Sequence, residues 1–170
     1  FEDRADAGRQ LTEKLGKYKD KNAVILALPR GGVVVGYEIA KYLAAPLDLI
    51  ITRKIGHPTS PEYAICAVAE DGHTLCNEDE RAMIDKTWVD NEIEMGQEEA
   101  RRRREVYLKG KSRNLKGKTA IIVDDGIATG LTLRLAIEEV KHENPAKIIV
   151  AVPVVPEDAA AKIGKTVSVF

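Results

Sequence analysis

The chain has 170 residues, 44% of them apolar and 31% charged, which suits one globular domain with a sizeable core. Its formal net charge of -1 gives no global electrostatic reason to expect nucleic acid or a membrane surface as a partner. No apolar run approaches the roughly 20 residues that span a bilayer, and the charged first residues predict no signal peptide.

The two cysteines, Cys66 and Cys76, are too few for a disulfide framework. We expect both to be free thiols that serve as small apolar side chains in a reducing, cytoplasmic compartment. The three histidines show no metal-ligand spacing, so a zinc site is not expected.

Helical and strand-like segments alternate along most of the chain. Helical spacing covers residues 3–18, 31–44, 129–143 and 156–164. Short runs rich in Ile and Val, typical of strands buried on both faces, cover 22–29, 46–53, 118–125 and 146–155, and "TVSVF" follows as a further strand. This order predicts an α/β fold with a Rossmann-like, mostly parallel sheet flanked by helices.

The middle of the chain departs from this alternation. Two strand-like runs within residues 62–77 surround Asp71-Gly72, a pair that predicts a type I′ β-hairpin. A long polar helix is expected next. The prediction is therefore a single domain over residues 1–170, with its core at about 20–56 and 116–170 and a hairpin-plus-helix insertion at about 62–112.

Asn77 and Glu80 form a capping box at the start of the helical stretch 78–110, which Gly96 is expected to interrupt. Its sparse apolar stripe predicts packing onto the domain, although a hood over a ligand site or a homodimer surface would use the same stripe. The stripe comprises Ile84, Trp88, Val89, Ile93, Ala100 and Tyr107. The arginines at 101–104 point all round the helix axis, and Glu98 and Glu99 precede Arg102 and Arg103 by four residues. That spacing favours a solvated, ion-paired helix over a nucleic-acid surface.

The stretch "IIVDDGIATGLT" (121–132) carries the clearest chemical signal. Asp124 and Asp125 follow a buried strand, at the edge of a parallel sheet where ligands bind. The small residues behind them expose backbone N–H groups at the start of a helix, which favours a phosphate. These residues are Gly126, Ile127, Ala128, Thr129, Gly130 and Thr132. Acids beside a phosphate loop suit a ribose 5-phosphate, with its diols on the carboxylates, and the Gly-Lys-Ser/Thr of a Walker loop is absent.

This stretch resembles the phosphoribosyl-pyrophosphate (PRPP) motif of the type I phosphoribosyltransferases. "LALPRGGVVVG" (26–36) resembles the pyrophosphate loop of that family, formed here by Arg30, Gly31 and Gly32. The resemblance implies an unusual, often cis, peptide at Arg30–Gly31 or its neighbour. The opening "FEDRADAGRQL" is similar to a subgroup of phosphoribosyltransferases without an assigned acceptor.

Arg53-Lys54 resembles the basic pair before the family's mobile catalytic loop, where a cation contacts pyrophosphate. The following residues would form a lid that excludes water. The lid residues are Gly56, Pro58, Ser60 and Pro61.

The resemblance implies Mg²⁺-dependent transfer of phosphoribose from PRPP to a small-molecule acceptor, with release of pyrophosphate. Asp124 and Asp125 would hold the ribose hydroxyls and, mostly indirectly, the metal. Arg30 and Lys54 would complete the catalytic set by neutralising the pyrophosphate. No general base is identifiable, and Glu62 and Glu70 are candidates by position only.

Ala128 stands where 6-oxopurine enzymes of the family carry an Asp. The acceptor is therefore expected to be a nitrogenous base other than a 6-oxopurine. Two alternatives stay open: a non-catalytic module that senses PRPP or a nucleotide, and an unrelated doubly wound phosphate binder.

Overall fold

The computed structural model describes residues 1–128, 130–164 and 167–169. They fall into two compact units. The first unit comprises Phe1–Ile50, Arg113–Ala128 and Val140–Phe170, and the second comprises Ile51–Ser112 and Thr129–Glu139. The second unit is larger than the expected insertion because it begins at Ile51 and also takes in most of the helix that follows the two acids. The single-domain organisation stays a prediction.

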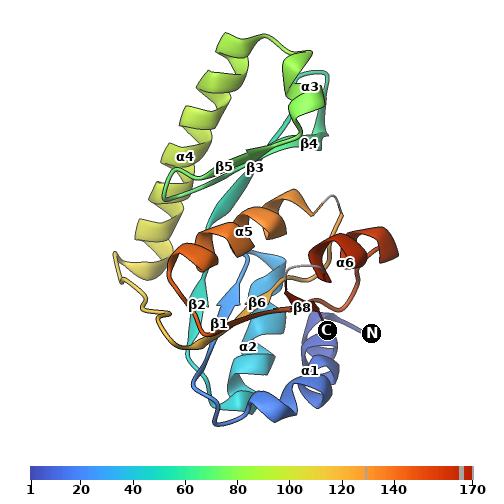
Figure 1. The fold of residues 1–170 in the computed structure, drawn as a ribbon, viewed down its shortest axis with the longest axis vertical. Coiled ribbons are helices and arrows are strands. Elements are labelled where there is room, and N and C mark those ends of the chain that lie inside the picture. Colours follow the sequence, from blue (N-terminus) through green and yellow to red (C-terminus); the bar gives the residue numbers. More distant parts are fainter. Residues whose placement is uncertain (129, 165–166, 170) are drawn as a thin grey trace. The chain divides into compact units, whose positions relative to one another are not determined.

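The first unit is built on a parallel five-stranded sheet in the order β2-β1-β6-β7-β8 (Figure 1). Its strands are β1 (Ala23–Ala27), β2 (Leu47–Leu49), β6 (Thr119–Val123), β7 (Lys147–Ala151) and β8 (Ser168–Val169). Its helices are α1 (Arg4–Leu15), which continues into a 3₁₀ turn (Gly16–Tyr18), α2 (Gly31–Leu43) and α6 (Glu157–Gly164). α5 (Leu131–His142) begins in the second unit and ends in the first. The predicted mostly parallel sheet with flanking helices is confirmed.

The core of the first unit lies between this sheet and the pair α1 and α2. Every residue of β1 is buried, as expected for a central parallel strand. The buried cluster contains Leu11, Leu15, Tyr18, Ala23, Ile25, Val35, Ile39, Ala40, Leu43, Ile121, Val123, Ile149 and Ala151. Because β1 and β6 pair along their whole length, the loops that follow them begin side by side.

The two helices approach each other closely at Gly8. A Cβ added to Gly8 would lie 2.9 Å from both the Cβ of Glu38 and the carbonyl oxygen of Val35. Asp3 caps α1 by accepting a hydrogen bond from the N–H of Asp6 (2.7 Å). The first turn of α1 is thus held in a fixed place relative to α2.

The second unit holds an antiparallel three-stranded sheet in the order β3-β4-β5. Its strands are β3 (Thr52–His57), β4 (Ser60–Ala69) and β5 (Thr74–Cys76), and its helices are α3 (Glu78–Ala82) and α4 (Lys86–Leu108). Val89, Trp88, Ile93 and Ile84 pack against the sheet, as the apolar stripe predicted. Leu131 and Leu135 of α5 pack on alanines of β4.

Three predictions for local structure are wrong. The run 46–53 is not one strand, because Leu47–Leu49 pairs with β1 whereas Thr52 already pairs with β4. The stretch 78–110 is two helices, and Asp85 caps the second by accepting from the N–H of Trp88 (2.8 Å). Gly96 does not interrupt α4; an added Cβ there would lie 2.8 Å from Cγ2 of Val68, so the glycine permits close packing on the sheet.

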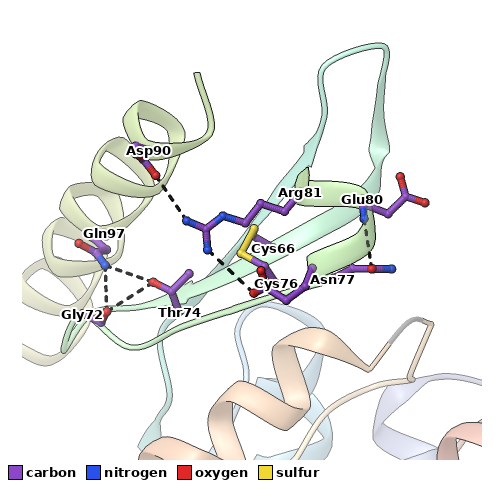
Figure 2. Close-up of a disulfide and its surroundings, with 10 residues drawn as sticks. Cys66, Gly72, Thr74, Cys76, Asn77, Glu80, Arg81, Asp90 and Gln97 are labelled. Atoms are coloured by element: carbon purple, nitrogen blue, oxygen red, sulfur yellow. Dashed lines mark hydrogen bonds and ion pairs between the residues drawn. A yellow bond between two sulfur atoms is a disulfide. The ribbon is translucent and has the colours of Figure 1, made fainter. Parts of the chain in front are cut away.

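The hairpin around Asp71-Gly72 is present, but its turn is not type I′. The N–H of Gly72 donates to the carbonyl of Ala69 (3.2 Å), and Gly72 has a φ of 96°. Asp71 is not among the described residues with positive φ, whereas a type I′ turn needs positive φ at both central positions. Figure 2 shows the side chain of Gln97 donating to the carbonyl of Gly72 (3.0 Å), which ties α4 to this turn.

Arg102 and Arg103 on α4 are ion-paired, as expected, but both pair with Glu99. Glu99 accepts from Arg102 (2.7 Å) and Arg103 (2.9 Å), and these hydrogen bonds lower the pKa of Glu99 to about 2. Arg104 instead pairs with Glu70 at 3.1 Å, with both side chains largely buried. Within the residues that the structure describes, no helix is long and apolar enough to cross a membrane.

Cys66 and Cys76 face each other across β4 and β5 and are joined by a disulfide (Figure 2). Their Cα atoms are 4.0 Å apart, and Cys66 is fully buried beside Ile55 of β3. The prediction of two free thiols is therefore wrong. The reducing, cytoplasmic compartment loses that support and stays a prediction.

Reduction of this disulfide is expected to lower the free energy of unfolding by about 2–3 kcal/mol, because the bond closes a loop between residues ten positions apart. Urea unfolding with and without dithiothreitol measures the difference. A Cys66→Ala/Cys76→Ala variant is the control and should not respond to the reductant. Two titratable thiols in denatured, unreduced protein would contradict the bond itself.

Candidate functional site

Asp124 and Asp125 lie immediately after β6, at the carboxyl edge of the parallel sheet. Both side chains are half-buried. The N–H of Asp125 donates to Oδ1 of Asp124 (2.8 Å), so the backbone fixes the first carboxylate. The position agrees with the rule that ligands bind outside the carboxyl ends of strands in open α/β sheets.

Burial raises the pKa of Asp124 from its ordinary value of 3.8 to about 7. The hydrogen bond from the backbone of Asp125 acts in the opposite direction, and the neighbouring charge of Asp125 raises the pKa further. Near neutral pH the pair therefore carries less than two full negative charges, which lessens its repulsion of a phosphorylated ligand.

The start of α2, directly after the loop that follows β1, packs against this acid pair. A Cβ added to Gly31 would collide with the carboxylate of Asp125, and one added to Gly32 would lie 2.7 Å from the carbonyl oxygen of Val123. Gly31 and Gly32 are thus required by close approach of two chain segments. The Pro29–Arg30 peptide bond is cis, one bond before Arg30–Gly31. This is the neighbouring bond that the prediction allowed.

A residue that the sequence did not indicate joins the acids. Nε of Arg4, in the first turn of α1, donates to Oδ2 of Asp125 at 2.7 Å. The side chain of Arg4 is 61% exposed and that of Asp125 is 30% exposed. The two residues are 121 positions apart, so no local spacing could have found the pair.

The small-residue loop supplies fewer donors than its sequence suggests. The N–H of Ile127 donates to the carbonyl of Val154 (3.0 Å), so this group is already used. Ala128 is exposed, Gly130 has a φ of 77°, and Thr132 is half-buried in the first turn of α5. Thr129 lies outside the described residues. An added Cβ on Gly126 would have the carbonyl oxygen of Val154 as its nearest neighbour at 3.7 Å.

The predicted pyrophosphate cations are all exposed. The side chain of Arg30 has no hydrogen bond or ion pair within the described ranges, and its carbonyl accepts from the N–H of Val33 (3.2 Å). Arg53 and Lys54 lie on β3 in the second unit, where Nζ of Lys54 is 3.5 Å from Oε2 of Glu62. Successive strand residues point to opposite faces, so Arg53 and Lys54 cannot both face one ligand. The predicted lid is a β-hairpin, since Gly56 belongs to β3 and residues 60–61 to β4.

The two candidate general bases differ in their surroundings. Glu70 is paired with Arg104 at 3.1 Å, and its side chain is only 11% exposed. Glu62 is 96% exposed beside Lys54. Glu70, which directly follows β4, therefore has a structural role in binding Arg104 of α4 and is poorly placed to exchange protons with a ligand.

The residues present fit a magnesium ion that takes only one or two ligands from the protein. Among the described residues, no cluster of three or more His, Cys, Asp or Glu could hold a metal. Asp124 and Asp125 are neighbouring hard oxygen ligands, and Mg²⁺ is commonly bound by one or two carboxylates together with substrate phosphates. The acid pair fits that kind of site.

Comparisons with known proteins agree with this geometry. A family model described as "Phosphoribosyl transferase domain" matches residues 2–169. Two Mycobacterium tuberculosis proteins, provisionally named phosphoribosyl transferases, are 42% identical over 165 residues, which is 95% of this chain. The chain spans 37% of the length of these curated relatives.

Solved structures resemble the chain as well. The crystal structure of TT1426 from Thermus thermophilus has a TM-score of 0.79 and 35% identity, and the match covers 100% of this chain and 82% of that one. A purine phosphoribosyltransferase from Pyrococcus horikoshii matches at a TM-score of 0.52 and 23% identity, over 88% of this chain and 70% of that one. At that identity the likeness concerns the fold alone.

Proposed function

The chain belongs to the phosphoribosyl transferase domain family, and from this premise we propose that it binds PRPP with Mg²⁺ and transfers phosphoribose to an acceptor, releasing pyrophosphate. One observation carries the proposal: Gly31, the first residue of α2 after β1, abuts the carboxylate of Asp125, in the loop after β6. A ligand at that junction meets carboxylates and a glycine-rich backbone at once. A ribose that bears pyrophosphate on C1 carries its hydroxyls close to its phosphates, just as the carboxylates here lie close to the glycine-rich backbone.

Asp124 and Asp125 would accept hydrogen bonds from the ribose 2′- and 3′-hydroxyls. Their negative charge would also favour the cationic, oxocarbenium-like ribose that forms as the C1–O bond breaks. The loop over 126–132 would anchor the 5′-phosphate, with Gly126, Gly130 and the helix start as donors in place of Ile127. Binding energy from this remote phosphate would fix the geometry at C1.

Arg30 would neutralise the leaving pyrophosphate together with the backbone N–H of Gly31, since the N–H of Gly32 already donates to the carbonyl of Leu28 (3.1 Å). The exposure of the Arg30 side chain and its lack of a side-chain partner among the described residues support that role. Lys54 is the candidate from the second unit, and its weak, exposed pairing with Glu62 leaves it available. Bound Mg²⁺ would supply charge neutralisation at the pyrophosphate and ribose oxygens, with Asp124 and Asp125 as its protein ligands, mostly through water.

We further propose that the acceptor is a nitrogenous base other than a 6-oxopurine. Ala128 carries no acid or base at the position where such purines would need one, and the side chain is exposed. Of the two candidate bases, Glu70 is held by Arg104 at 3.1 Å, and Glu62 is exposed beside Lys54.

Calorimetry with PRPP and Mg²⁺, followed by a pyrophosphate-release assay across pyrimidines, adenine and 6-oxopurines, tests the function. We expect PRPP binding and turnover with at least one base other than hypoxanthine, guanine or xanthine. Binding without turnover on any base would favour the PRPP-sensing module instead. Failure to bind PRPP would reject both.

A further inference from the structure

The contact between Arg4 and Asp125 uses only one of the five N–H groups of the guanidinium. Nε of Arg4 donates to Oδ2 of Asp125 at 2.7 Å. Nη1 and Nη2 have no hydrogen bond or ion pair with any residue of the described ranges. Arginine commonly meets a carboxylate with two parallel hydrogen bonds, so this single contact leaves four donors uncommitted beside the acid pair.

The stability of α1 does not explain why an arginine stands here. Arg4 is the first residue of α1, where a positive charge opposes the helix dipole. An ion pair with one partner 61% exposed contributes little to folding. Close packing at Gly8 nevertheless holds α1 against α2, so the backbone delivers this side chain to Asp125.

The contact lies on the pyrophosphate side of the acid pair. The oxygen that accepts from Arg4, Oδ2 of Asp125, is also the atom nearest to a Cβ added on Gly31. Gly31 begins α2 directly after the loop that follows β1, whereas the loop proposed for the 5′-phosphate begins at Gly126. Arg4 therefore meets the acid pair at the carboxylate oxygen that Gly31 abuts, and Gly31 directly follows Arg30 in the chain.

We infer that Arg4 is a substrate-binding residue whose Nη groups bind the pyrophosphate of the ligand while Nε holds Asp125 in place. A guanidinium edge with free donors matches phosphate oxygens better than ribose hydroxyls, because both charge and spacing are complementary. The inference rests on the proposed function, since it assigns one more residue to the same site.

The test is calorimetry in the presence of Mg²⁺ with three separate probes: PRPP, inorganic pyrophosphate and ribose 5-phosphate. Arg4→Ala should weaken PRPP and pyrophosphate about 10- to 100-fold and ribose 5-phosphate less than about 3-fold. Arg9→Ala is the matched control, because Arg9 lies on the same helix, is 56% exposed and pairs with Asp6. It should change none of the three affinities, and both variants should keep the wild-type Tm.

An Asp125→Asn background separates direct binding from positioning. If Arg4 touches pyrophosphate, Arg4→Ala still weakens pyrophosphate at least about 5-fold in that background. If the loss disappears there, or falls equally on ribose 5-phosphate, the inference is wrong and Arg4 acts only through Asp125. Unchanged affinities in Arg4→Ala overturn it too. Wild-type protein that binds neither PRPP nor pyrophosphate overturns the proposed function itself, which is a different result.

Discussion

Asparagine at both Asp124 and Asp125 is expected to lower phosphoribosyl transfer at least about 100-fold while making the ligand-free protein more stable above pH 7. Activity should fall because the amides keep the shape of the side chains but lose the charge that favours a cationic ribose. Pyrophosphate release at saturating PRPP measures this loss. Asp48→Asn is the matched control, since Asp48, in β2, is also half-buried and accepts from the next N–H, that of Leu49, at 2.7 Å.

The gain in stability should depend on pH in a defined direction. The pKa of Asp124 is raised from 3.8 to about 7 in the folded protein, so the folded state holds this proton more tightly than the unfolded state. The stability linked to that proton is complete below about pH 4 and is lost as the pH rises through 7. Asparagine cannot ionise, so Asp124→Asn should gain about 1–3 kcal/mol by pH 8 and much less at pH 4.

Thermal unfolding of Asp124→Asn and wild type between pH 4 and pH 9 measures that gain. A difference in Tm that does not change with pH would contradict the raised pKa. Undiminished turnover in the double variant would reject the proposed site, whatever the stabilities.

Gly31→Ala is expected to reduce PRPP affinity at least about 100-fold, because the new methyl group would occupy the space of the Asp125 carboxylate. Either the Asp125 carboxylate or the backbone at Gly31 must move, and PRPP binding is proposed to need the two side by side. Calorimetry with PRPP measures the loss. Gly164→Ala is the control, since an added Cβ there has nothing within 4 Å.

A double-mutant cycle identifies the clash. If Asp125 is the obstacle, the loss of stability in Gly31→Ala should be largely relieved in an Asp125→Ala background, where the carboxylate is gone. Strictly additive changes in the free energy of unfolding would show that another group is responsible. Wild-type PRPP affinity in Gly31→Ala would contradict the close approach altogether.

Most of the fold could be predicted from hydrophobic periodicity. The segments around β1, β6 and β7 are short runs rich in Ile, Val and Ala with helices between them, and that pattern has few alternatives to a parallel sheet. The run 46–53 was predicted as one strand because Leu49, Ile50 and Ile51 are apolar across the point where the chain changes sheets. Ile50 and Ile51 are buried between β2 and β3, so composition gives no sign of where the chain leaves one sheet for the other.

The sequence did not predict the disulfide because it predicted the wrong type of turn at the hairpin. Around a two-residue type I′ turn at Asp71-Gly72, Cys66 would lie opposite Asn77, and the two cysteines would point to opposite faces. The observed turn shifts the pairing by one residue and places Cys66 opposite Cys76. A shift of one residue in the register of β4 and β5, set by the turn, thus determines whether the two thiols can form a bond.

In the candidate site, too, the residues that are neighbours in sequence could be predicted, whereas contacts between distant residues could not. Asp124 and Asp125 could be found because acid pair, small loop and helix are contiguous in sequence. The contact of Arg4 with Asp125 depends on how α1 packs on α2 through Gly8, and no periodicity specifies that. The loss of the Ile127 N–H to Val154 likewise depends on a segment 27 residues away.

A cut in the backbone between the two cysteines would leave the polypeptide in one covalent piece. Asp71, Gly72 and His73 are exposed at the tip of the hairpin, where proteases commonly act. Nicked protein would then migrate as a single band in a non-reducing gel and as two fragments after reduction. The same tip is a natural place to open the chain for new termini or for an inserted epitope, because the cross-link would keep β4 and β5 together on either side of the break.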